Sequence, residues 1–330
     1  MIGIGGSLPR AGTLKTWLTW LLVAPFAIWA AARVSGLEPG YPAIQLLAFT
    51  PYAALASLVP LALAVLTKRL WPAIVAAVVA VAFAACILPR WIADAGAGTT
   101  AGPTLRVMTV NMLYGQADPA QIVRLVRDGA VDLLAMQEYT AEGQAAMRAA
   151  GLETALPYTA TYPRPDAGGS AVYSRFPLAE TGYRQLAGGF FQAHAKVRVP
   201  DGPEVYVESA HPCAPMGRGS SACWVADLAA QPAATPGGPV TVLMGDFNST
   251  LDHKAFRRVV TKGYHDAADV AGAGLATSWP YDDRWYFPSV TLDHILTDQR
   301  VGVRHVVVYR IARSDHRAVF AELALPKAAG

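Results

Sequence analysis

Three stretches in the N-terminal third of the chain contain no charged residue, and this feature constrains the fold more than any other. They are Thr16–Ala32, Pro39–Thr67 and Leu70–Pro89, with 17, 29 and 20 residues. A helix needs about 20 apolar residues to cross a bilayer core of roughly 30 Å, because unpaired backbone groups cannot face lipid. The second and third stretches reach that length and the first is marginal. We therefore expect residues 1–91 to form a membrane anchor with about three transmembrane helices.

The first stretch also fits a different segment type. Arg10 and Lys15 precede the apolar run, which ends in Ala30-Ala31-Ala32. Basic residues, an apolar run and small residues in that order are typical of a cleaved signal peptide. The sequence leaves both interpretations open.

Lys and Arg counts in the short loops indicate the orientation of the anchor, because cytoplasmic loops carry an excess of them. With a cytoplasmic N-terminus, the inside residues are Arg10, Lys15, Lys68 and Arg69, and the outside residues are Arg33 and Arg90. A cleaved first segment leads to the same result, since Lys68 and Arg69 still mark the inner loop. We expect a multi-pass protein of the cell membrane with its C-terminal domain outside the cytoplasm.

The remainder has the composition of a water-soluble domain. Residues 1–102 hold six Lys or Arg and two Asp or Glu out of totals of 27 and 24, which leaves 21 and 22 for residues 103–330. That formal charge of −1 counts against a nucleic-acid partner, since phosphate-backbone binding needs a cationic surplus. Residues 92–103, rich in Ala, Gly and Thr, read as a flexible linker of roughly 20 Å, which would hold residues 104–326 near the bilayer.

Apolar and alternating runs in residues 104–326 predict many strands and few helices. The expected strands are Leu105–Asn111, Val131–Gln137, Ser170–Ser174, Ala193–Val199, Val205–Ser209, Val240–Met244, Thr291–Leu296, Val303–Tyr309 and Ala318–Leu323. Asp118-Pro119, Thr140 and Asp252 are expected to begin helices as N-caps. The pattern predicts an α+β domain of two packed sheets flanked by helices.

Polar residues that can bind metals or move protons recur at the ends of these strands. They are Asn111, Glu138, His211, Asp246, Asn248, Asp293, His294, Asp315 and His316. Residues of binding and catalytic sites often lie at such positions, where a rigid scaffold holds them in place. One of them alone indicates little, since a lone His is more often structural, but the set is unusual.

These segments resemble the ordered motifs of the endonuclease/exonuclease/phosphatase superfamily. They read Thr109-Val110-Asn111, Met136-Gln137-Glu138, Ser209-Ala210-His211, Gly245-Asp246-Phe247-Asn248, Leu292-Asp293-His294-Ile295-Leu296 and Ser314-Asp315-His316, and Tyr173-Ser174-Arg175-Phe176-Pro177 matches a further structural signature. The resemblance implies a four-layer αββα sandwich behind the transmembrane helical anchor. It also implies a metal-dependent hydrolase of phosphate esters.

The resemblance and the chemistry of each side chain together suggest roles. Glu138 offers a hard carboxylate for Mg²⁺, with Mn²⁺ as a substitute, and Asn111 and Asp315 complete the expected metal set. We expect His211, Asp246, Asn248, Asp293 and His316 to be catalytic. Asp246 orients and deprotonates water, Asn248 and the histidines donate to phosphoryl oxygens, and Asp293 pairs with His316. Whether Asp246 or His316 is the base stays open.

One position departs from the superfamily pattern. Some nucleases of the superfamily carry an acid two residues after the first Asn, and here that residue is Leu113. Because a second metal ligand is missing there, the sequence favours one metal ion.

The expected substrate is a lipid-linked phosphate. The anchor confines the site near the bilayer, and Trp285-Tyr286-Phe287-Pro288 could form an aromatic rim that enters the interface, with core packing as an equal alternative. Three spans followed by such a domain also resemble the VanJ-type teicoplanin-resistance membrane phosphatases. That implies hydrolysis of undecaprenyl pyrophosphate at the outer face, recycling of a cell-wall lipid carrier, and antibiotic resistance. The alternatives are an extracytoplasmic nuclease and a sphingomyelinase-like phosphodiesterase.

The cysteines fit an oxidising compartment. Cys213 and Cys223 are ten residues apart in a segment containing Pro, Gly and Ser, and outside the cytoplasm they could form a disulfide. Two free thiols are the alternative. Cys86 lies in the third apolar stretch, where it is a small apolar filler.

Overall fold

The computed structural model describes residues 11–94, 100–281 and 288–327. Backbone contacts divide the chain into two units. The first contains residues 1–38 and 49–88, and the second contains residues 39–48 and 89–330. The predicted aromatic rim at residues 285–288 lies almost wholly outside the described residues.

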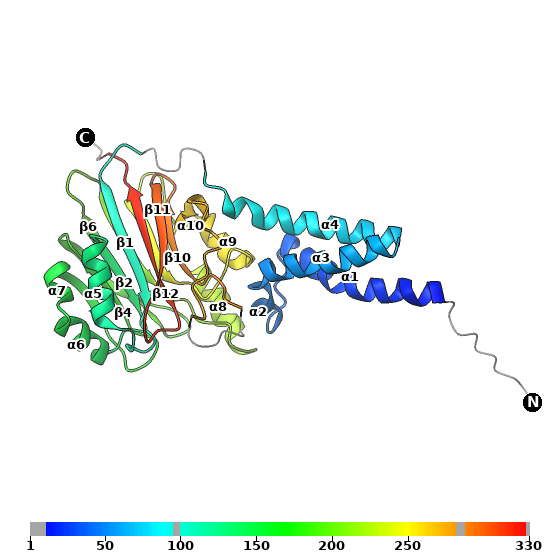
Figure 1. Ribbon diagram of the computed structural model, residues 1–330. Helices are drawn as coiled ribbons and strands as arrows, with labels where there is room; N and C mark the ends of the chain where they lie inside the picture. Colours follow the sequence, from blue (N-terminus) through cyan, green and yellow to red (C-terminus); the bar gives the residue numbers. More distant parts are fainter. Residues whose placement is uncertain (1–10, 95–99, 282–287, 328–330) are drawn as a thin grey trace, which may run out of the picture. The chain divides into compact units, whose positions relative to one another are not determined.

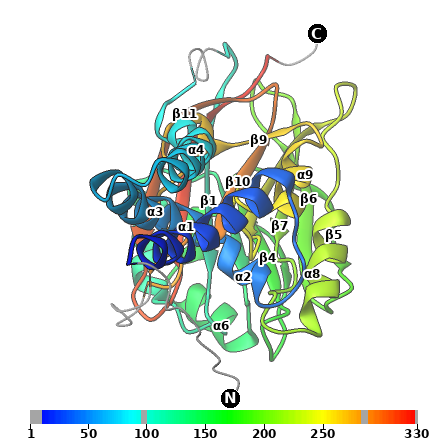
Figure 2. The same cartoon turned by 90° about the vertical axis from the view of Figure 1, so that its right-hand side faces the viewer.

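The first unit is a bundle of three apolar helices, α1 (Ala11–Ser35), α3 (Thr50–Leu66) and α4 (Leu70–Ile87), which lie alongside one another (Figure 2). Among the described residues, two helical segments are long and apolar enough to cross a membrane, Lys15–Ser35 and Leu70–Trp91, and only 22% of each is buried. The 17-residue helix α3 is apolar but shorter. By length and composition, these two segments are therefore candidates for membrane spans.

The predicted 29-residue span is not one helix. Its first ten residues belong to the second unit and contain the short helix α2 (Ala43–Leu47), while α3 begins only at Thr50. Pro39, Gly40 and Pro42 explain the break, since Pro lacks the N–H that a continuous helix needs and Gly40 has a left-handed φ of 94°.

The second unit contains two six-stranded sheets (Figure 1). The first has the order β11 (Gly302–Arg310), β12 (Arg317–Ala324), β1 (Thr104–Asn111), β2 (Leu133–Gln137), β4 (Ser170–Ser174), β3 (Tyr158–Tyr162). The second has the order β5 (Leu178–Gln185), β6 (Phe191–Arg198), β7 (Glu204–Ala210), β8 (Val240–Asp246), β10 (Asp293–Asp298), β9 (Tyr264–Asp266). Both sheets are mixed, because β1–β2 and β7–β8 are parallel and the other pairs are antiparallel.

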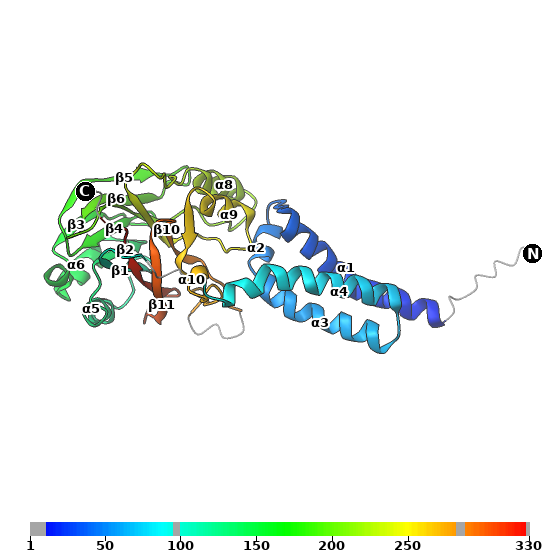
Figure 3. The ribbon, with the colours of Figure 1, turned by 90° about the horizontal axis from the view of Figure 1, so that it is seen from above.

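Helices cover the outer face of each sheet, which gives an αββα sandwich (Figures 1 and 3). The helices α5 (Pro119–Asp128), α6 (Ala141–Ala149) and α7 (Leu152–Ala155) lie on one side, and α8 (Ser220–Ala229), α9 (Lys254–Val260) and α10 (Ala267–Val270) follow strands of the second sheet. The largest apolar cluster joins the inner faces of both sheets, for example Val107 of β1 with Val207 and Val242 of β7 and β8. Alternate side chains of each strand fill this layer, as packed sheets require.

A polar contact crosses the two sheets at the end of this core. The side-chain amide of Gln137 donates to Ser209 Oγ at 2.9 Å, and the Thr109 hydroxyl donates to Gln137 Oε1 at 3.2 Å. All three side chains are fully buried. Because a buried polar group is costly without its partner, these contacts specify how β1, β2 and β7 align.

Two segments next to the apolar helices are packed into the second unit. The guanidinium of Arg90, in the 3₁₀ turn η1 (Leu88–Trp91), makes two hydrogen bonds to the buried carboxylate of Asp252 at 2.9 and 2.7 Å. Ile44 of α2 is buried among aromatic side chains of the α8–α9 layer, and its carbonyl accepts from His253 Nε2 at 2.8 Å. Asp94 donates its backbone N–H to Val270, so the first residues of the predicted linker also pack on the domain.

The structure corrects several sequence-based expectations. Asp252 is not an N-cap: α9 begins at Lys254 with His253 as its cap residue, and the Asp252 carboxylate binds Arg90 instead. Strands β3, β5 and β9 and helix α8 were not predicted. β5 is an edge strand of mostly exposed and half-buried residues, so it lacks a clear apolar pattern. Asp118 and Thr140 are N-caps as predicted, each accepting backbone N–H groups of its helix.

The Arg90–Asp252 pair gives a test of how firmly the segment after α4 is held. We expect Asp252→Ala to lower the free energy of unfolding by about 3–5 kcal/mol, because it leaves the Arg90 guanidinium buried without this carboxylate. The double variant Arg90→Met with Asp252→Leu should recover most of that loss. Urea denaturation of the detergent-solubilised chain, followed by tryptophan fluorescence, measures both.

Glu322→Ala is the matched control. Glu322 pairs with Arg106, but both side chains are more than a quarter exposed, so the loss should stay below about 1 kcal/mol. Equal losses of unfolding free energy for Asp252→Ala and Glu322→Ala would contradict a stabilising role of the buried Arg90–Asp252 pair.

Candidate active site

The ends of four central strands and the starts of two others converge at one edge of the sandwich. Asn111 ends β1, Glu138 follows β2, His211 follows β7 and Asp246 ends β8. Asp293 begins β10 directly opposite Asp246 in the antiparallel register, and His316 precedes β12. The two sheets therefore both contribute side chains to one cluster.

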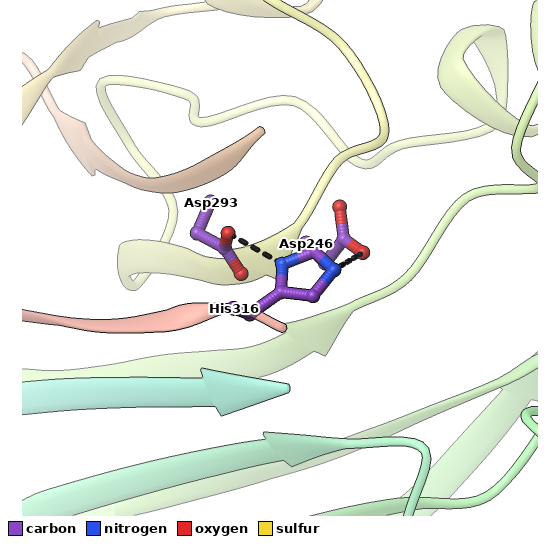
Figure 4. Close-up of side chains that lie close together, drawn as sticks. All are labelled: Asp246, Asp293 and His316. Atoms are coloured by element: carbon purple, nitrogen blue, oxygen red, sulfur yellow. Dashed lines mark hydrogen bonds and ion pairs between the residues drawn. The ribbon is translucent and has the colours of Figure 1, made fainter. Parts of the chain in front are cut away.

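His316 lies between two carboxylates (Figure 4). Its Nδ1 is 2.8 Å from Asp293 Oδ2, and its Nε2 is 3.6 Å from Asp246 Oδ2. All three side chains are buried. The nitrogen or oxygen atom of each that could bind a metal ion lies within 4.8 Å of the other two. Ser278 Oγ accepts the N–H of Asp293, and Ser314 Oγ accepts the N–H of His316, so the backbone under the pair is fixed.

The charges of this group are strongly coupled. Burial by itself lowers the pKa of His316, but the carboxylates of Asp293 and then Asp246 outweigh it and hold the pKa above the ordinary value. Burial raises the pKa of Asp246, and the nearby His316 cation opposes that rise. The imidazole is therefore a cation at neutral pH, held on one side by Asp293 and facing Asp246 on the other.

Asn111 links this group to Glu138. Its amide nitrogen donates to Glu138 Oε1 and to Asp246 Oδ2, both at 3.1 Å, and its side-chain oxygen accepts the N–H of Leu113 at 2.9 Å. Donors and acceptors around the amide fix this orientation. Asn111, predicted as part of the metal set, thus acts on Glu138 through its N–H groups while its oxygen is already engaged.

Four residues other than glycine in this site have left-handed backbones. They are Leu113, Tyr114, Glu138 and Asn248, with φ between 44° and 53°. Such conformations cost on the order of 1 kcal/mol each and collect at functional sites. Here they turn the Tyr114 N–H onto Glu138 Oε2 at 2.9 Å. The motifs gave no signal for this strain, because none of the four is glycine.

His211 and Asn248 lie at the other side of Asp246. His211 Nε2 is 3.8 Å from Asp246 Oδ2, and burial lowers the pKa of the imidazole to about 3, so it is a neutral donor. Asn248 gives its N–H to Asp246 Oδ1 at 2.8 Å, and its amide donates to the carbonyl of Pro212 at 3.0 Å. Asn248 therefore ties the Asp246 turn to the His211 segment, in addition to any contact with a phosphoryl oxygen.

The residues around Glu138 fit a divalent cation. Burial raises the pKa of Glu138, hydrogen bonds from Asn111 and Tyr114 oppose this, and the nearby Asp315 carboxylate raises it further. A cation would relieve the repulsion between Glu138 and Asp315, and oxygen ligands suit Mg²⁺. The Asp315 side chain is positioned by the indole N–H of Trp279, which donates to Oδ2 at 3.0 Å.

Not every polar residue at a strand end belongs to the site. Both ring nitrogens of His294 are occupied, Nδ1 by Asp266 at 2.5 Å and Nε2 by the carbonyl of Ser249 at 2.9 Å. Its role is to hold β9 and the loop after β8. Conversely, the supporting residues Ser278 and Trp279 were missed, since they lie in an irregular segment without a motif.

The sulfur atoms of Cys213 and Cys223 are joined in the structure, with Cα atoms 5.9 Å apart. The bridge links the segment just after His211 to α8. Asp227 of α8 supports the same segment, because its carboxylate accepts the N–H of Cys213 at 2.9 Å. In the chain-entropy model a loop of this size contributes roughly 3 kcal/mol.

The αββα sandwich and its cluster of Asp, His, Asn and Glu at the strand ends define a hydrolase scaffold of the phosphoesterase class. Residues 108–316 match the family model of the Endonuclease/Exonuclease/phosphatase family, which is more than half of the 330 residues, and the chain belongs to this family. The predicted superfamily membership is thereby confirmed, and the two mixed sheets packed with helices agree with the predicted α+β sandwich. The family's enzymes are divalent-metal-dependent hydrolases.

Solved structures show the same fold at low identity. The endonuclease/exonuclease/phosphatase from Beutenbergia cavernae is 19% identical, and the match covers 68% of this chain and 72% of the Beutenbergia chain, with a TM-score of 0.53. Truncated TDP2 from Caenorhabditis elegans is 16% identical over 67% and 98%, with a TM-score of 0.51. The family protein from Bacteroides vulgatus is 15% identical over 68% and 99%, with a TM-score of 0.50. No curated protein matches this chain.

The coupled charges predict a bell-shaped dependence of kcat/KM on pH. Activity should rise as Asp246 ionises, above the ordinary carboxyl range of about 4, and fall as His316 loses its proton, above the ordinary value of about 6.5. Asp293→Asn removes the strongest support of the His316 cation, so the alkaline limb should move to lower pH. Phosphate release measured from pH 4 to 10 at saturating metal gives both limbs.

Asp298→Asn is the control, since Asp298 ends β10 and its carboxylate binds Arg300 away from the cluster. Its profile should match that of the unaltered chain. An alkaline limb that stays in place in Asp293→Asn would show that His316 is not the group that titrates there.

Proposed function

We propose that this protein is a membrane-anchored, divalent-metal-dependent phosphohydrolase acting on a lipid-linked phosphate or pyrophosphate, with undecaprenyl pyrophosphate as the first candidate. The observation that carries the proposal is the continuous contact chain from Asp293 through His316 and Asp246 to Asn111 and Glu138. In this proposal Asp246 is the proton acceptor, His316 is the cationic donor and Glu138 is the metal-binding carboxylate of one site.

We propose a catalytic role for each group. Because His316 already carries a proton on both nitrogens, Asp246 is the group that can accept a proton from the attacking water. Nε2 of His316 and Nε2 of His211 lie 3.6 and 3.8 Å from Asp246 Oδ2, so both imidazoles can donate to the charge that develops on phosphoryl oxygens beside Asp246. A cation on Glu138 and Asp315 would supply Lewis-acid stabilisation of a phosphoryl oxygen.

The proton inventory of the reaction is balanced. An oxygen of water bonds to phosphorus and the proton of that water passes to Asp246, while the bond from phosphorus to the leaving oxygen breaks and its electron pair stays on that oxygen. Asp246 then gives the proton to the leaving oxygen or to solvent, which restores the carboxylate. Asp293 keeps His316 oriented and charged throughout, since its carboxylate is buried and hydrogen-bonded to Nδ1.

A lipid substrate is supported by features outside the site. Lys15–Ser35 and Leu70–Trp91 have the length and composition of membrane spans. Residues 103–330 have a formal charge of −1, which disfavours a polyanionic nucleic-acid backbone. Residues 39–48 and 89–94 pack within the catalytic unit, so little chain separates it from the apolar helices.

The substrate class is tested with the full chain in detergent and Mg²⁺. Undecaprenyl pyrophosphate, a sphingomyelin-type phosphodiester and supercoiled DNA are offered in parallel, and phosphate release, head-group release and DNA nicking are measured. We expect phosphate release from the lipid pyrophosphate and no nicking. Chelator should abolish the activity, and Asp246→Asn should lower kcat by about 10²–10⁴-fold.

Glu138→Gln tests the metal site, because it preserves size and removes the charge. The Mg²⁺ concentration for half-maximal activity should rise by at least roughly 10- to 100-fold. Glu142→Gln, four residues away on the exposed surface of α6, should change nothing. Full activity in excess chelator would refute the metal dependence, and nicking without phosphate release would favour the nuclease.

We further propose that the catalytic unit lies outside the cytoplasm, as the Lys and Arg counts of the short loops indicate. Protease added to intact spheroplasts should then release a fragment containing residues 104–326, detected with an antibody to the C-terminus. Protection of the chain until the membrane is permeabilised would reverse the orientation.

A further inference from the structure

A cavity of about 270 Å³ lies beside the catalytic cluster, and none of the catalytic steps uses it. Its walls come from Tyr114, from Arg164 and residues 166–168 between β3 and β4, and from residues 188–190 between β5 and β6. The Tyr114 N–H donates to Glu138, and the ring centroid of Phe190 is 4.8 Å from that of His211. A group that occupies this cavity therefore adjoins the phosphorus held at the cluster.

The cavity is held open by specific contacts with the catalytic strands. The buried carboxylate of Asp227 accepts the N–H groups of both Gly188, at 3.2 Å, and Cys213, at 2.9 Å. A Cβ on Gly188 would lie only 2.7 Å from the Cβ of Cys213, so only glycine fits there. Residues 164–169 are tied to Tyr139, directly after Glu138, by reciprocal backbone hydrogen bonds with Arg164 and Gly169.

One pair of charged side chains lines the cavity. Arg164 donates from Nε and Nη2 to the two oxygens of Asp166, both at 2.9 Å, and its guanidinium carbon lies 4.8 Å from the Phe191 ring centroid. Among the described residues, Nη1 makes no hydrogen bond. The hydrogen bonds from Arg164 lower the pKa of Asp166 to about 2, so both charges persist at neutral pH.

The Arg164–Asp166 pair favours some chemical groups over others as occupants of the cavity. A hydroxyl group both donates and accepts, and the pair presents the Nη1 donor next to the carboxylate acceptor. A second phosphate would be repelled by the Asp166 carboxylate and attracted by the Arg164 guanidinium, and these two interactions nearly cancel. A purely apolar group would cover both charged side chains without giving them a hydrogen bond, which is costly. The apolar surface of Phe190 suits the carbon skeleton of a ring or polyol.

We propose that this cavity binds an uncharged, hydroxyl-bearing group attached to the scissile phosphate, such as a sugar or a glycerol unit, with Arg164 donating to it and Asp166 accepting from it. The proposal rests on the proposed phosphohydrolase function and narrows its substrate class to polyol phosphates, which ranks lipids that carry such a group above undecaprenyl pyrophosphate, whose scissile phosphate is joined to a second phosphate. The shared chemistry is a polyol phosphate, and its source can be a lipid-linked sugar phosphate or a glycerophospholipid head group.

Matched pairs of soluble phosphates test the cavity in the full chain with Mg²⁺. Glucose 1-phosphate is compared with cyclohexyl phosphate, and glycerol 1-phosphate with propyl phosphate, so that each pair differs in hydroxyl groups. Hydrogen bonds to charged partners predict that kcat/KM favours the hydroxylated member by roughly 10- to 100-fold. A preference confined to one pair identifies the source as sugar or glycerol.

Variants assign the preference to these residues. Asp166→Asn and Arg164→Gln should each lower the ratio of kcat/KM within a pair at least tenfold. Arg148→Gln is the control, because Arg148 forms an exposed ion pair with Glu153 that contributes nothing to the cavity, and its ratio should be unchanged. Circular dichroism and thermal unfolding verify that all three variants fold.

The outcomes separate this inference from the proposed function. Phosphate release with a ratio near one in the unaltered chain overturns the polyol subsite and leaves the phosphohydrolase in place. Faster hydrolysis of farnesyl pyrophosphate that depends on Arg164 but not Asp166 overturns it in favour of an anion subsite. If no phosphate ester is hydrolysed, the proposed function fails. Binding measured by calorimetry then tests the subsite separately. The subsite requires that the hydroxylated member of each pair binds more tightly and that Asp166→Asn abolishes this difference.

Discussion

The buried cation of His316 between Asp293 and Asp246 is the interaction on which the rest of the site depends. A charge with almost no exposure is stable only where opposite charges and hydrogen bonds replace water. Asp293 and Asp246 face each other across the β8–β10 register of the second sheet, whereas His316 precedes β12 of the first. The charge is therefore compensated only when the two sheets are packed in one relative position.

The layer beneath the cluster enforces that position. The Thr109–Gln137–Ser209 contacts cross from one sheet to the other. Because all three side chains are fully buried, water cannot replace a hydrogen bond that breaks. Asn111 then extends the same alignment to Glu138 on one side and Asp246 on the other. With the alignment fixed by buried groups, the strand ends can carry left-handed residues and closely spaced carboxylates that would not persist in a looser scaffold.

How far the sequence predicts this site depends on where each residue lies. Asn111, Glu138, Asp246 and Asp293 follow or begin buried strands whose apolar runs are easy to recognise, so both the strands and their terminal residues could be predicted. Arg164, Ser278 and Trp279 lie in irregular segments, where no periodicity marks them and only tertiary contacts give them a role.

Asp252 shows a different reason for failure. Its position before a helical run is typical of an N-cap, but a buried guanidinium 162 residues away in the chain competes for the same carboxylate and binds it with two hydrogen bonds. Local propensity is worth about 1 kcal/mol, which is less than a buried arginine loses without its partner. Edge strand β5 escaped prediction because its solvent-facing residues need no apolar alternation.

The contacts of Arg90 and Ile44 imply that the catalytic fold extends beyond the residues that match the family. His253 Nδ1 accepts the N–H of Thr250, so its Nε2 carries the proton that it donates to the carbonyl of Ile44. The loop that joins Asp246 to α9 is thus braced by residues 44 and 90, which flank the apolar helices and lie outside residues 108–316. A fragment cut to the family match would leave the Asp252 carboxylate without its guanidinium and open the aromatic cluster around Phe247 to water. Since Phe247 lies between Asp246 and Asn248 in the chain, the segments next to the apolar helices are part of what positions the candidate base.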